Sequence, residues 1–188
     1  MTTETIMSVF LGIGLVASVG FRIFLPLFSL SLASYFNVWE LNDSWLWIGS
    51  FTALVIFGVA TLIEIFAYYI SFVDNLLDAV AVPLATFAGT AVMVSTVVNL
   101  SPEITWTLAI IAGGGTAAAI SGVLGATRLA STATTAGIGN PVVSTIETGT
   151  ALVISIVTIF LPIVGFVLVL ILAFIIFKIF KKIKRTSS

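Results

Sequence analysis

The sequence predicts an all-α fold, a polytopic transmembrane helical bundle that forms a single domain over residues 1–188. Of the 188 residues, 60% are hydrophobic and only 8% are charged, whereas a soluble domain carries about 25% charged residues. So few charges cannot cover a surface in water, and we expect the lipid bilayer to be a main partner of the chain. The apolar runs are long and continuous, without the alternating polarity of spanning strands, which favours helices.

The composition also excludes several classes of function. Cysteine and histidine are both absent, which excludes thiol chemistry, disulfides, Cys/His metal sites and catalysis with histidine as the base. We therefore expect no enzyme activity and no cofactor, and assign no metal site, although oxygen ligands for hard cations remain available. The net charge of −1 gives no reason to expect a nucleic-acid partner. The N-terminal segment contains Glu4 but no lysine or arginine, which argues against a cleaved signal peptide.

The first apolar stretch, residues 6–36, is interrupted near its middle. Gly20-Phe21-Arg22 places a charge far from either end of the run, and Pro26 follows it. Proline inside a helix removes a hydrogen bond and clashes with the preceding turn. The pattern predicts a broken or re-entrant helix, and the alternative is one kinked helix whose Arg22 side chain extends to the headgroups.

Further spans are predicted at residues 46–70, 79–100, 104–126 and 148–177. The third of these starts after Ser101-Pro102-Glu103, which has the N-cap, the first-position proline and the acidic first turn of a helix start.

Two segments near the C-terminal end are less regular. The polar segment 127–150, with a turn signal at Asn140-Pro141, is expected to be folded rather than a linker. The last apolar run measures about 40 Å as a helix, which exceeds a hydrocarbon core of about 30 Å. We expect it to tilt, to kink at Pro162 or to protrude.

The C-terminal tail, residues 178–188, contains five basic residues, and the other loops contain none. These residues are Lys178, Lys181, Lys182, Lys184 and Arg185. The positive-inside rule therefore predicts a cytoplasmic C-terminus.

The span at residues 104–126 contains two adjacent ridges of small residues spaced four apart. They are Gly113, Ala117, Ser121 and Gly125 in one ridge and Gly114, Ala118, Gly122 and Ala126 in the other. In lipid, such a face lets helix backbones approach closely. We predict a tight helix–helix seam, with a substrate path as the alternative.

The charges inside the apolar regions are the candidates for function. A charge at the bilayer centre costs about 3 kcal/mol on insertion scales, so such residues face a bundle interior, pair with each other or line a hydrated cavity. Together with two asparagines they are our candidates for a substrate or ion pathway: Arg22, Glu64, Asp74, Asn75, Asp78, Arg128, Asn140 and Glu147. We expect the two arginines to point inward and to pair with Glu64 and Glu147.

Two arginines cannot neutralise four carboxylates, so a fully buried set would bind a cation or hold protons. Asp74 and Asp78 are four residues apart, and on a helix they would share one face and repel each other. A shared proton or cation would relieve this repulsion. The alternative is a hydrated loop whose acids cap the next helix.

A repeat would account for the two arginines. Gly20-Phe21-Arg22 and Gly125-Ala126-Thr127-Arg128 each follow an apolar helix rich in small residues and precede a long span. Matching interrupted segments in two halves are the sequence signature of a repeat transporter, so two structural repeats are among our predictions.

Four stretches of the chain resemble the domain of unknown function 4126, a family of uncharacterised bacterial integral membrane proteins. They are GFRIFLPLF (20–28), EIFAYYISFVDNLLD (64–78), WTLAIIAGGG (106–115) and STATTAGIGNPVVSTIE (131–147). The resemblance extends over nearly the whole chain. It implies a location in the bacterial inner membrane and supplies no substrate, activity or cofactor.

The leading functional hypothesis is a small transporter or permease for a small solute, an ion or a lipid-linked species. Its basis is the broken helices, the embedded charges and the glycine-rich packing. A passive channel lined by the Ser/Thr/Gly segment is a second hypothesis. A third is a non-transporting scaffold or accessory subunit, and a homo-oligomer is left open. An enzyme is disfavoured because no nucleophile–base pair is visible.

Overall fold

The computed structural model describes residues 2–186, except for the side chains of residues 71, 72, 176, 177 and 179–186. Helices make up nearly all of this part of the chain, which confirms the all-α prediction. In order they are α1 (Thr3–Phe21), α2 (Phe24–Tyr35), the 3₁₀-helix η1 (Asp43–Gly49), α3 (Phe51–Ala67), α4 (Ser71–Thr96), α5 (Pro102–Leu108), the π-helical turn η2 (Ala109–Gly114), α6 (Gly115–Thr135), α7 (Asn140–Phe160) and α8 (Pro162–Thr186).

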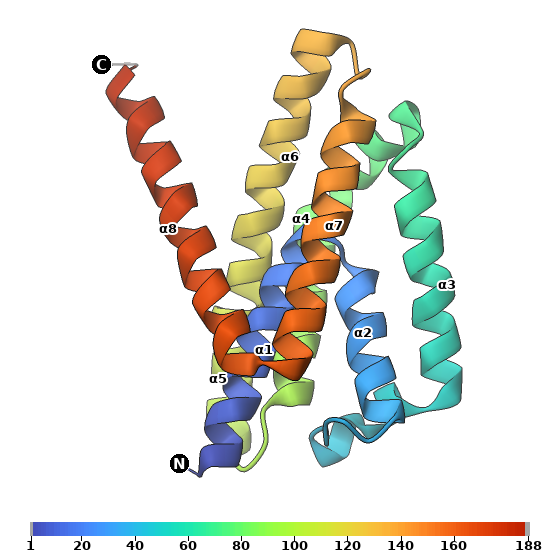
Figure 1. The fold of residues 1–188 in the computed structure, drawn as a ribbon, viewed down its shortest axis with the longest axis vertical. Coiled ribbons are helices and arrows are strands. Elements are labelled where there is room, and N and C mark those ends of the chain that lie inside the picture. The colour runs from blue at the N-terminus through green and yellow to red at the C-terminus, as the bar shows by residue number, and fades with distance from the viewer. Residues whose placement is uncertain (1, 187–188) are drawn as a thin grey trace.

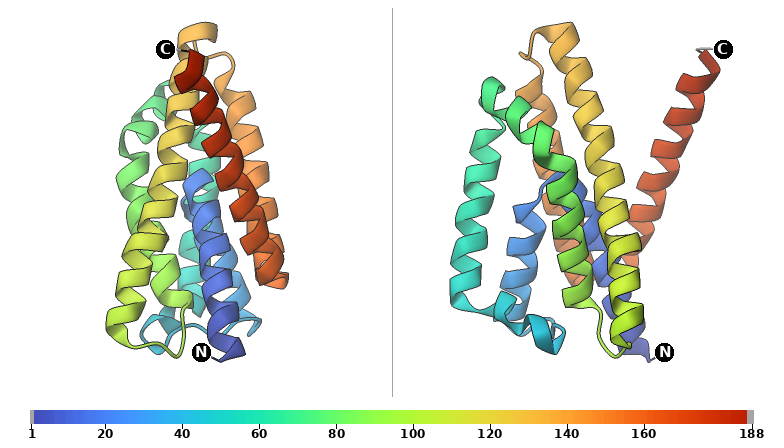
Figure 2. Two further views of the ribbon diagram at one scale, coloured as in Figure 1. Left: turned by 90° about the vertical axis from the view of Figure 1, so that its left-hand side faces the viewer. Right: turned by 180° about the vertical axis from the view of Figure 1, so that it is seen from behind.

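The helices form an elongated bundle with the two termini at opposite ends (Figure 1). Within the described residues, four helices are long and apolar enough to cross a membrane, and a fifth span results if η1 and α3, bent by 63°, are counted together. Helices α3, α4 and α7 and the continuous segment α5–η2–α6 extend along the bundle, whereas α1 rises from the N-terminal end and stops inside it (Figures 1 and 2). Helix α2 then returns toward the N-terminal end. The chain is therefore built as a multi-pass membrane protein.

The predicted interruption of the first apolar stretch is present at Arg22. This residue has extended backbone angles, φ −145° and ψ 127°, and ends α1. Pro26 is the third residue of α2, where its missing N–H has no intrahelical partner to lose. The alternative of one kinked helix with Arg22 at the headgroups is wrong, because Arg22 is only 1% exposed.

The predicted span 148–177 is wrong as a single helix. Helix α7 ends at Phe160 and α8 starts at Pro162, with Leu161 between them in a non-helical conformation, φ −137° and ψ 72°. Proline cannot donate the hydrogen bond that would continue α7, and it disfavours helical angles at the residue before it. Consequently α7 and α8 run in opposite directions, joined by a sharp turn (Figure 1).

Other predicted boundaries also change. The polar segment 127–150 is divided between the end of α6 and the start of α7, with a turn in which Ala136 and Gly137 have positive φ values of 54° and 85°. Helix α4 starts at Ser71, eight residues before the predicted start, and contains Pro83. The predicted helix at 46–70 starts as η1 and becomes α-helical only at Phe51, where the Ser50 hydroxyl caps α3 by accepting from the Ala53 N–H. Polar caps and turns thus lie where hydropathy alone had predicted continuous spans.

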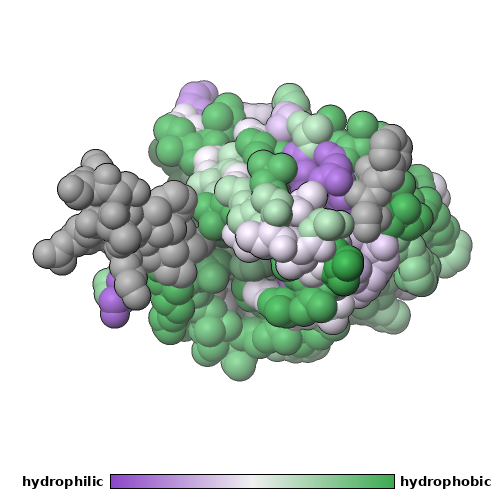
Figure 3. Space-filling model, turned by 90° about the horizontal axis from the view of Figure 1, so that it is seen from above, coloured by the Kyte–Doolittle hydropathy of each residue, from purple (hydrophilic) through white to green (hydrophobic). Residues whose placement is uncertain are grey.

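Helix α1 occupies the interior, and the outer helices face lipid. Leu11, Leu15 and Val16 of α1 are fully buried, and they belong to a core that also includes Val92 and Met93 of α4. Many large apolar side chains of α3 and α8 are exposed. Seen from above, hydrophobic residues form most of the rim, and polar residues gather toward the middle of this end (Figure 3). This distribution fits a bundle surrounded by lipid.

The small-residue seam exists only in its N-terminal half. A Cβ atom added to Gly113 would lie 2.7 Å from the carbonyl oxygen of Gly89, so η2 and α4 pack backbone to backbone. At Gly114 an added Cβ would meet the Thr90 hydroxyl at 2.7 Å. By contrast, Gly122 is exposed, and an added Cβ at Gly125 would meet nothing within 4 Å. The seam prediction is therefore wrong for Gly122 and Gly125 within this chain.

The ridge that starts at Gly114 becomes less buried along α6, because Ala118 is half-buried and Gly122 is exposed. The close approach itself continues into α6, because a Cβ atom added to Gly89 of α4 would lie 2.6 Å from the Ala117 Cβ. Helix α6 stays beside α4 further along, but Gly122 and Gly125 lie away from that contact. The two structural repeats stay a prediction.

Candidate functional site

The two arginines meet in the interior through one shared carboxylate. Arg128 of α6 forms ion pairs with Glu147 of α7 and Asp78 of α4, and its Nε also donates to Glu147 Oε1 at 3.2 Å. The Nη1 atom of Arg22 lies 3.6 Å from Glu147 Oε2. Arg22, Arg128 and Glu147 are 1%, 3% and 2% exposed. The prediction that both arginines point inward is confirmed, and Glu147 is the acid that joins them.

Tyr68 connects the same two arginines through its ring. The guanidinium carbons of Arg22 and Arg128 lie 4.1 and 4.0 Å from the ring centroid, within the distance of a cation–π contact. Tyr68 is buried directly after the end of α3. Tyr68 was not among the residues predicted from the sequence, and the signal that could have found it is its position four residues after the embedded Glu64. We call Arg22, Tyr68, Asp78, Arg128 and Glu147 the charge cluster.

Small polar residues of α7 complete the surroundings of Arg22. Its Nε donates to the Thr148 hydroxyl at 2.9 Å, and its Nη2 donates to the Ser144 carbonyl oxygen at 2.9 Å. Ser144 and Thr148 were missed because serine and threonine are common in membrane helices. They follow Asn140 at the spacing of one helical face, which was the available signal.

Glu64 has a different role from the one predicted. Its carboxylate accepts the backbone N–H groups of Ile23 and Phe24, at 2.7 and 2.9 Å, and so caps the N-terminus of α2. No ion pair between Glu64 and an arginine is present among the described residues. The predicted pairing of Glu64 with an arginine is therefore wrong. The break at Arg22 leaves amide groups of α2 without carbonyl partners inside the bundle, and a carboxylate satisfies them better than any neutral acceptor.

Asp74 and Asp78 lie on helix α4, so the alternative of a hydrated loop is wrong. Asp78 pairs with Arg128, whereas Asp74 is completely buried and accepts from the side-chain amide of Asn140 at 2.9 Å. The same amide nitrogen donates to the Thr132 hydroxyl at 2.9 Å. Asn75 lies on the exposed side of α4. The two aspartates thus avoid each other by taking different partners.

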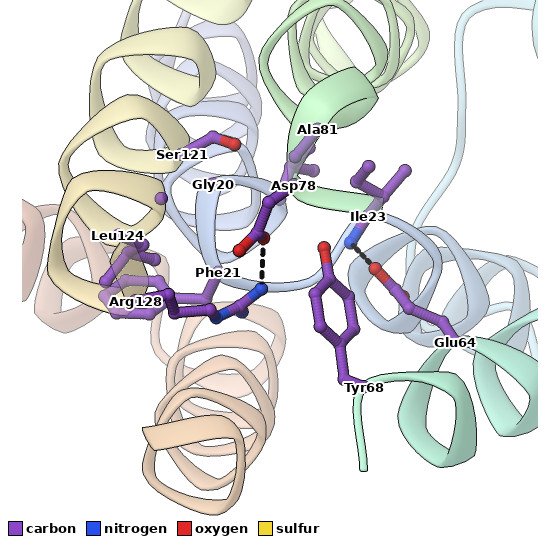
Figure 4. A pocket seen from close by; sticks show the side chains of 12 residues that line it. Gly20, Phe21, Ile23, Glu64, Tyr68, Asp78, Ala81, Ser121, Leu124 and Arg128 are labelled. Atoms are coloured by element: carbon purple, nitrogen blue, oxygen red, sulfur yellow. Dashed lines mark hydrogen bonds and ion pairs between the residues drawn. The ribbon is translucent and has the colours of Figure 1, made fainter. Parts of the chain in front are cut away.

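A cavity of about 10 Å³ lies between α1, α3, α4 and α6, which is about the space of one water molecule. Its lining includes Tyr68, Asp78 and Arg128 of the charge cluster, and also Glu64. Figure 4 shows the Tyr68 ring between the Arg128–Asp78 pair and the Glu64 carboxylate. Asp78, Arg128 and Glu147 each lie seven residues from the end of their helix at the C-terminal end of the bundle, a depth of about 10 Å. The cluster therefore lies inside the bundle, closer to this end than to the other.

Comparison with known proteins identifies the family. The family model of the domain of unknown function (DUF4126) matches residues 9–182, which include every member of the charge cluster. No curated protein and no solved structure matches the chain. Because the match extends over most of the sequence, the chain belongs to the DUF4126 family of proteins.

Proposed function

We propose that this protein is a secondary transporter of the bacterial inner membrane, driven by a cation gradient, in which the charge cluster is the element that changes state. The observation that carries the proposal is that Glu147 of α7 is shared by two arginines on two other helices, α1 and α6. Arg128 contacts both oxygens of this carboxylate. Arg22 Nη1, at 3.6 Å, has no hydrogen-bond partner. Two helices therefore compete for one carboxylate.

Such competition provides two discrete arrangements of the same residues. If α1 moves relative to α6, Glu147 can exchange its hydrogen bonds from Arg128 to Arg22 without leaving either charge unpaired. Broken helices whose ends meet near charged residues are the usual site of alternating access in small transporters. The α1–α2 break, capped by Glu64, supplies this feature next to the cluster.

The charge balance favours a cation as the driving ion. Two arginines, Arg22 and Arg128, face four carboxylates inside the bundle. Buried charges require compensation. Glu64 is compensated by the backbone N–H groups at the start of α2, so one monovalent cation would balance the three remaining carboxylates and the two arginines. A passive channel fits less well, because the cavity at the cluster has room for only about one water molecule. A scaffold is the second candidate, favoured by the pairing of both arginines within the chain.

Uptake by proteoliposomes tests the proposal. A panel of radiolabelled amino acids, sugars and organic cations is offered with an inward sodium gradient, an inward proton gradient or neither. We expect at least one compound to accumulate only when a gradient is imposed, and Glu147→Gln to reduce this uptake by about tenfold or more. The matched control is Glu40→Gln, the same change at an exposed position, which should keep the wild-type rate.

Two results would contradict this function. Equilibration of solutes without any gradient would identify a channel. An absence of gradient-dependent uptake for the whole panel would favour the scaffold.

We also propose an orientation in which the C-terminus is cytoplasmic and the N-terminus is periplasmic. The termini lie at opposite ends of the bundle (Figure 1), and the basic residues are concentrated after Phe177. Apart from Lys178, which is exposed, the side chains of these basic residues lie outside the described part of the structure. A reporter that is active only in the cytoplasm should function when fused after Ser188 and fail when fused before Met1. Activity in the reverse pattern would overturn the orientation.

A further inference from the structure

Asp74 and Asn140 leave two buried oxygen atoms without partners. Asp74 is 0% exposed and Asn140 is 1% exposed. Their side chains are joined by one hydrogen bond, from Asn140 Nδ2 to Asp74 Oδ2. Asp74 Oδ1 and Asn140 Oδ1 have no hydrogen-bond partner. An ionised carboxylate oxygen and a carboxamide oxygen are both acceptors only, so neither can satisfy the other.

Among buried acceptors without a hydrogen-bond partner, a carboxylate destabilises the fold most. Leaving a buried acceptor without a partner is unfavourable, and more so when it carries a charge. Asp78, one helical turn further along α4, has Arg128 as its cation. No ion pair to Asp74 occurs among the described residues. A positive charge placed between Asp74 Oδ1 and Asn140 Oδ1 would satisfy both oxygens and neutralise the carboxylate.

The available ligands fit a small, hard, monovalent ion. Carboxylate, carboxamide and hydroxyl oxygens are the ligands that hard cations prefer, and Asp74, Asn140 and the neighbouring Thr132 provide one of each. The described residues contain no group of three or more acidic side chains that could hold a metal ion together. One carboxylate matches the charge of sodium rather than that of a divalent cation.

The position of these residues allows exchange with water. Asp74 lies three residues after the start of α4, Thr132 lies three residues before the end of α6, and Asn140 starts α7. All three are therefore within one helical turn of the same end of the bundle, about 5 Å. The charge cluster lies one turn deeper, since Asp78 follows Asp74 by four residues. An ion at this site would lie next to the cluster and exchange with water at that end.

We propose that Asp74 and Asn140 bind one sodium ion, with Thr132 beside them. The site deepens the proposed function, because it names the driving cation, and only its role in coupling rests on that function. Binding itself is independent of transport. Release of the ion would leave Asp74 without a counter-charge one turn from Asp78, and so would alter the balance that holds Arg128.

Thermal unfolding of the purified protein in detergent tests the site. Sodium chloride is raised from 1 to 100 mM, with choline chloride keeping the ionic strength constant. Because an ion that binds only the folded state stabilises it by mass action, the wild-type midpoint should rise by about 5 °C. Asp74→Asn keeps the shape of the side chain and removes the charge, so this variant should unfold at the same temperature in both salts. Asp43→Asn, an exposed position, should respond like the wild type.

The wild-type measurement alone can overturn the site. Equal midpoints in sodium and choline would exclude it, whether or not the Asp74 variant folds. A sodium effect that persists in Asp74→Asn would also exclude it, because the ion would then bind elsewhere. Sodium-dependent stability without any solute uptake would leave the site intact and reject the transporter. Uptake driven only by a proton gradient, with equal unfolding midpoints in sodium and choline, would reject the sodium site and leave the transporter intact.

Discussion

Replacement of Arg128 by alanine should be among the most damaging single changes in this protein. It removes the cation that pairs with Asp78 and Glu147, together with the guanidinium group that stacks on Tyr68. Removing one partner of a buried ion pair leaves an uncompensated charge, which typically costs about 3–5 kcal/mol. We expect a loss of this size in the free energy of unfolding, measured by denaturant titration in mixed micelles. Lys178→Ala removes an exposed cation and should change the stability little.

A second substitution should recover part of this loss. In Arg128→Ala/Asp78→Asn, the remaining Arg22–Glu147 pair is balanced in charge, so the double variant should be more stable than Arg128→Ala alone. Glu64→Gln should give no such recovery, because Glu64 binds backbone N–H groups rather than an arginine. A double variant with Asp78→Asn that is less stable than the single variant would contradict the pairing.

Gly113→Leu should produce the other large effect, through packing rather than charge. A Cβ atom at this position would lie 2.7 Å from the Gly89 carbonyl oxygen and 2.8 Å from Met93 Cβ. Backbone on the opposite helix cannot move away as a flexible side chain would. Overpacking of this kind costs about 1–3 kcal/mol and occasionally more, and we expect the upper part of that range because helix α4 must shift as a whole.

The matched control is Gly122→Leu, the same substitution two and a half turns further along. Gly122 is exposed, and the nearest atom to an added Cβ is Val82 Cγ2 at 3.9 Å. This variant should stay within about 0.5 kcal/mol of the wild type. Thermal midpoints of the two variants in the same detergent make the comparison. If Gly113→Leu is tolerated as well as Gly122→Leu, the close approach of η2 to α4 is incorrect.

Several features of the fold could be predicted because they depend on local chemistry. A charge deficit and long apolar runs require a bilayer and therefore helices, and the break at Arg22 follows from a charge and a proline inside one run. The inward direction of both arginines follows from the same rule, since lipid solvates a guanidinium group poorly. The small-residue ridges indicated a close seam correctly at Gly113 and Gly114.

Other features depend on which helices become neighbours, and hydropathy carries no such information. The length of the last apolar run predicted a tilt, a kink at Pro162 or a protrusion from the bilayer. The chain instead reverses direction at Pro162, and α8 packs beside α1 and α7. Helical periodicity places Gly122 on the same ridge as Gly114, but at Gly122 this ridge has turned away from the contact between α6 and α4, and the residue is exposed. Periodicity defines a face of a helix, whereas the packing angle decides how far along that face a neighbour remains in contact.

Within the site, the sequence alone determined which residues carry the charge: two arginines and four carboxylates in an interior that lipid and apolar side chains surround. The partners were decided by the fold. Glu64 binds the amide groups that the α1–α2 break exposes, Glu147 is shared by Arg22 and Arg128, and Tyr68 lies against both. The reason is physical: a buried charge takes the nearest group that compensates it, and residues more than a hundred positions apart become near only when the helices pack.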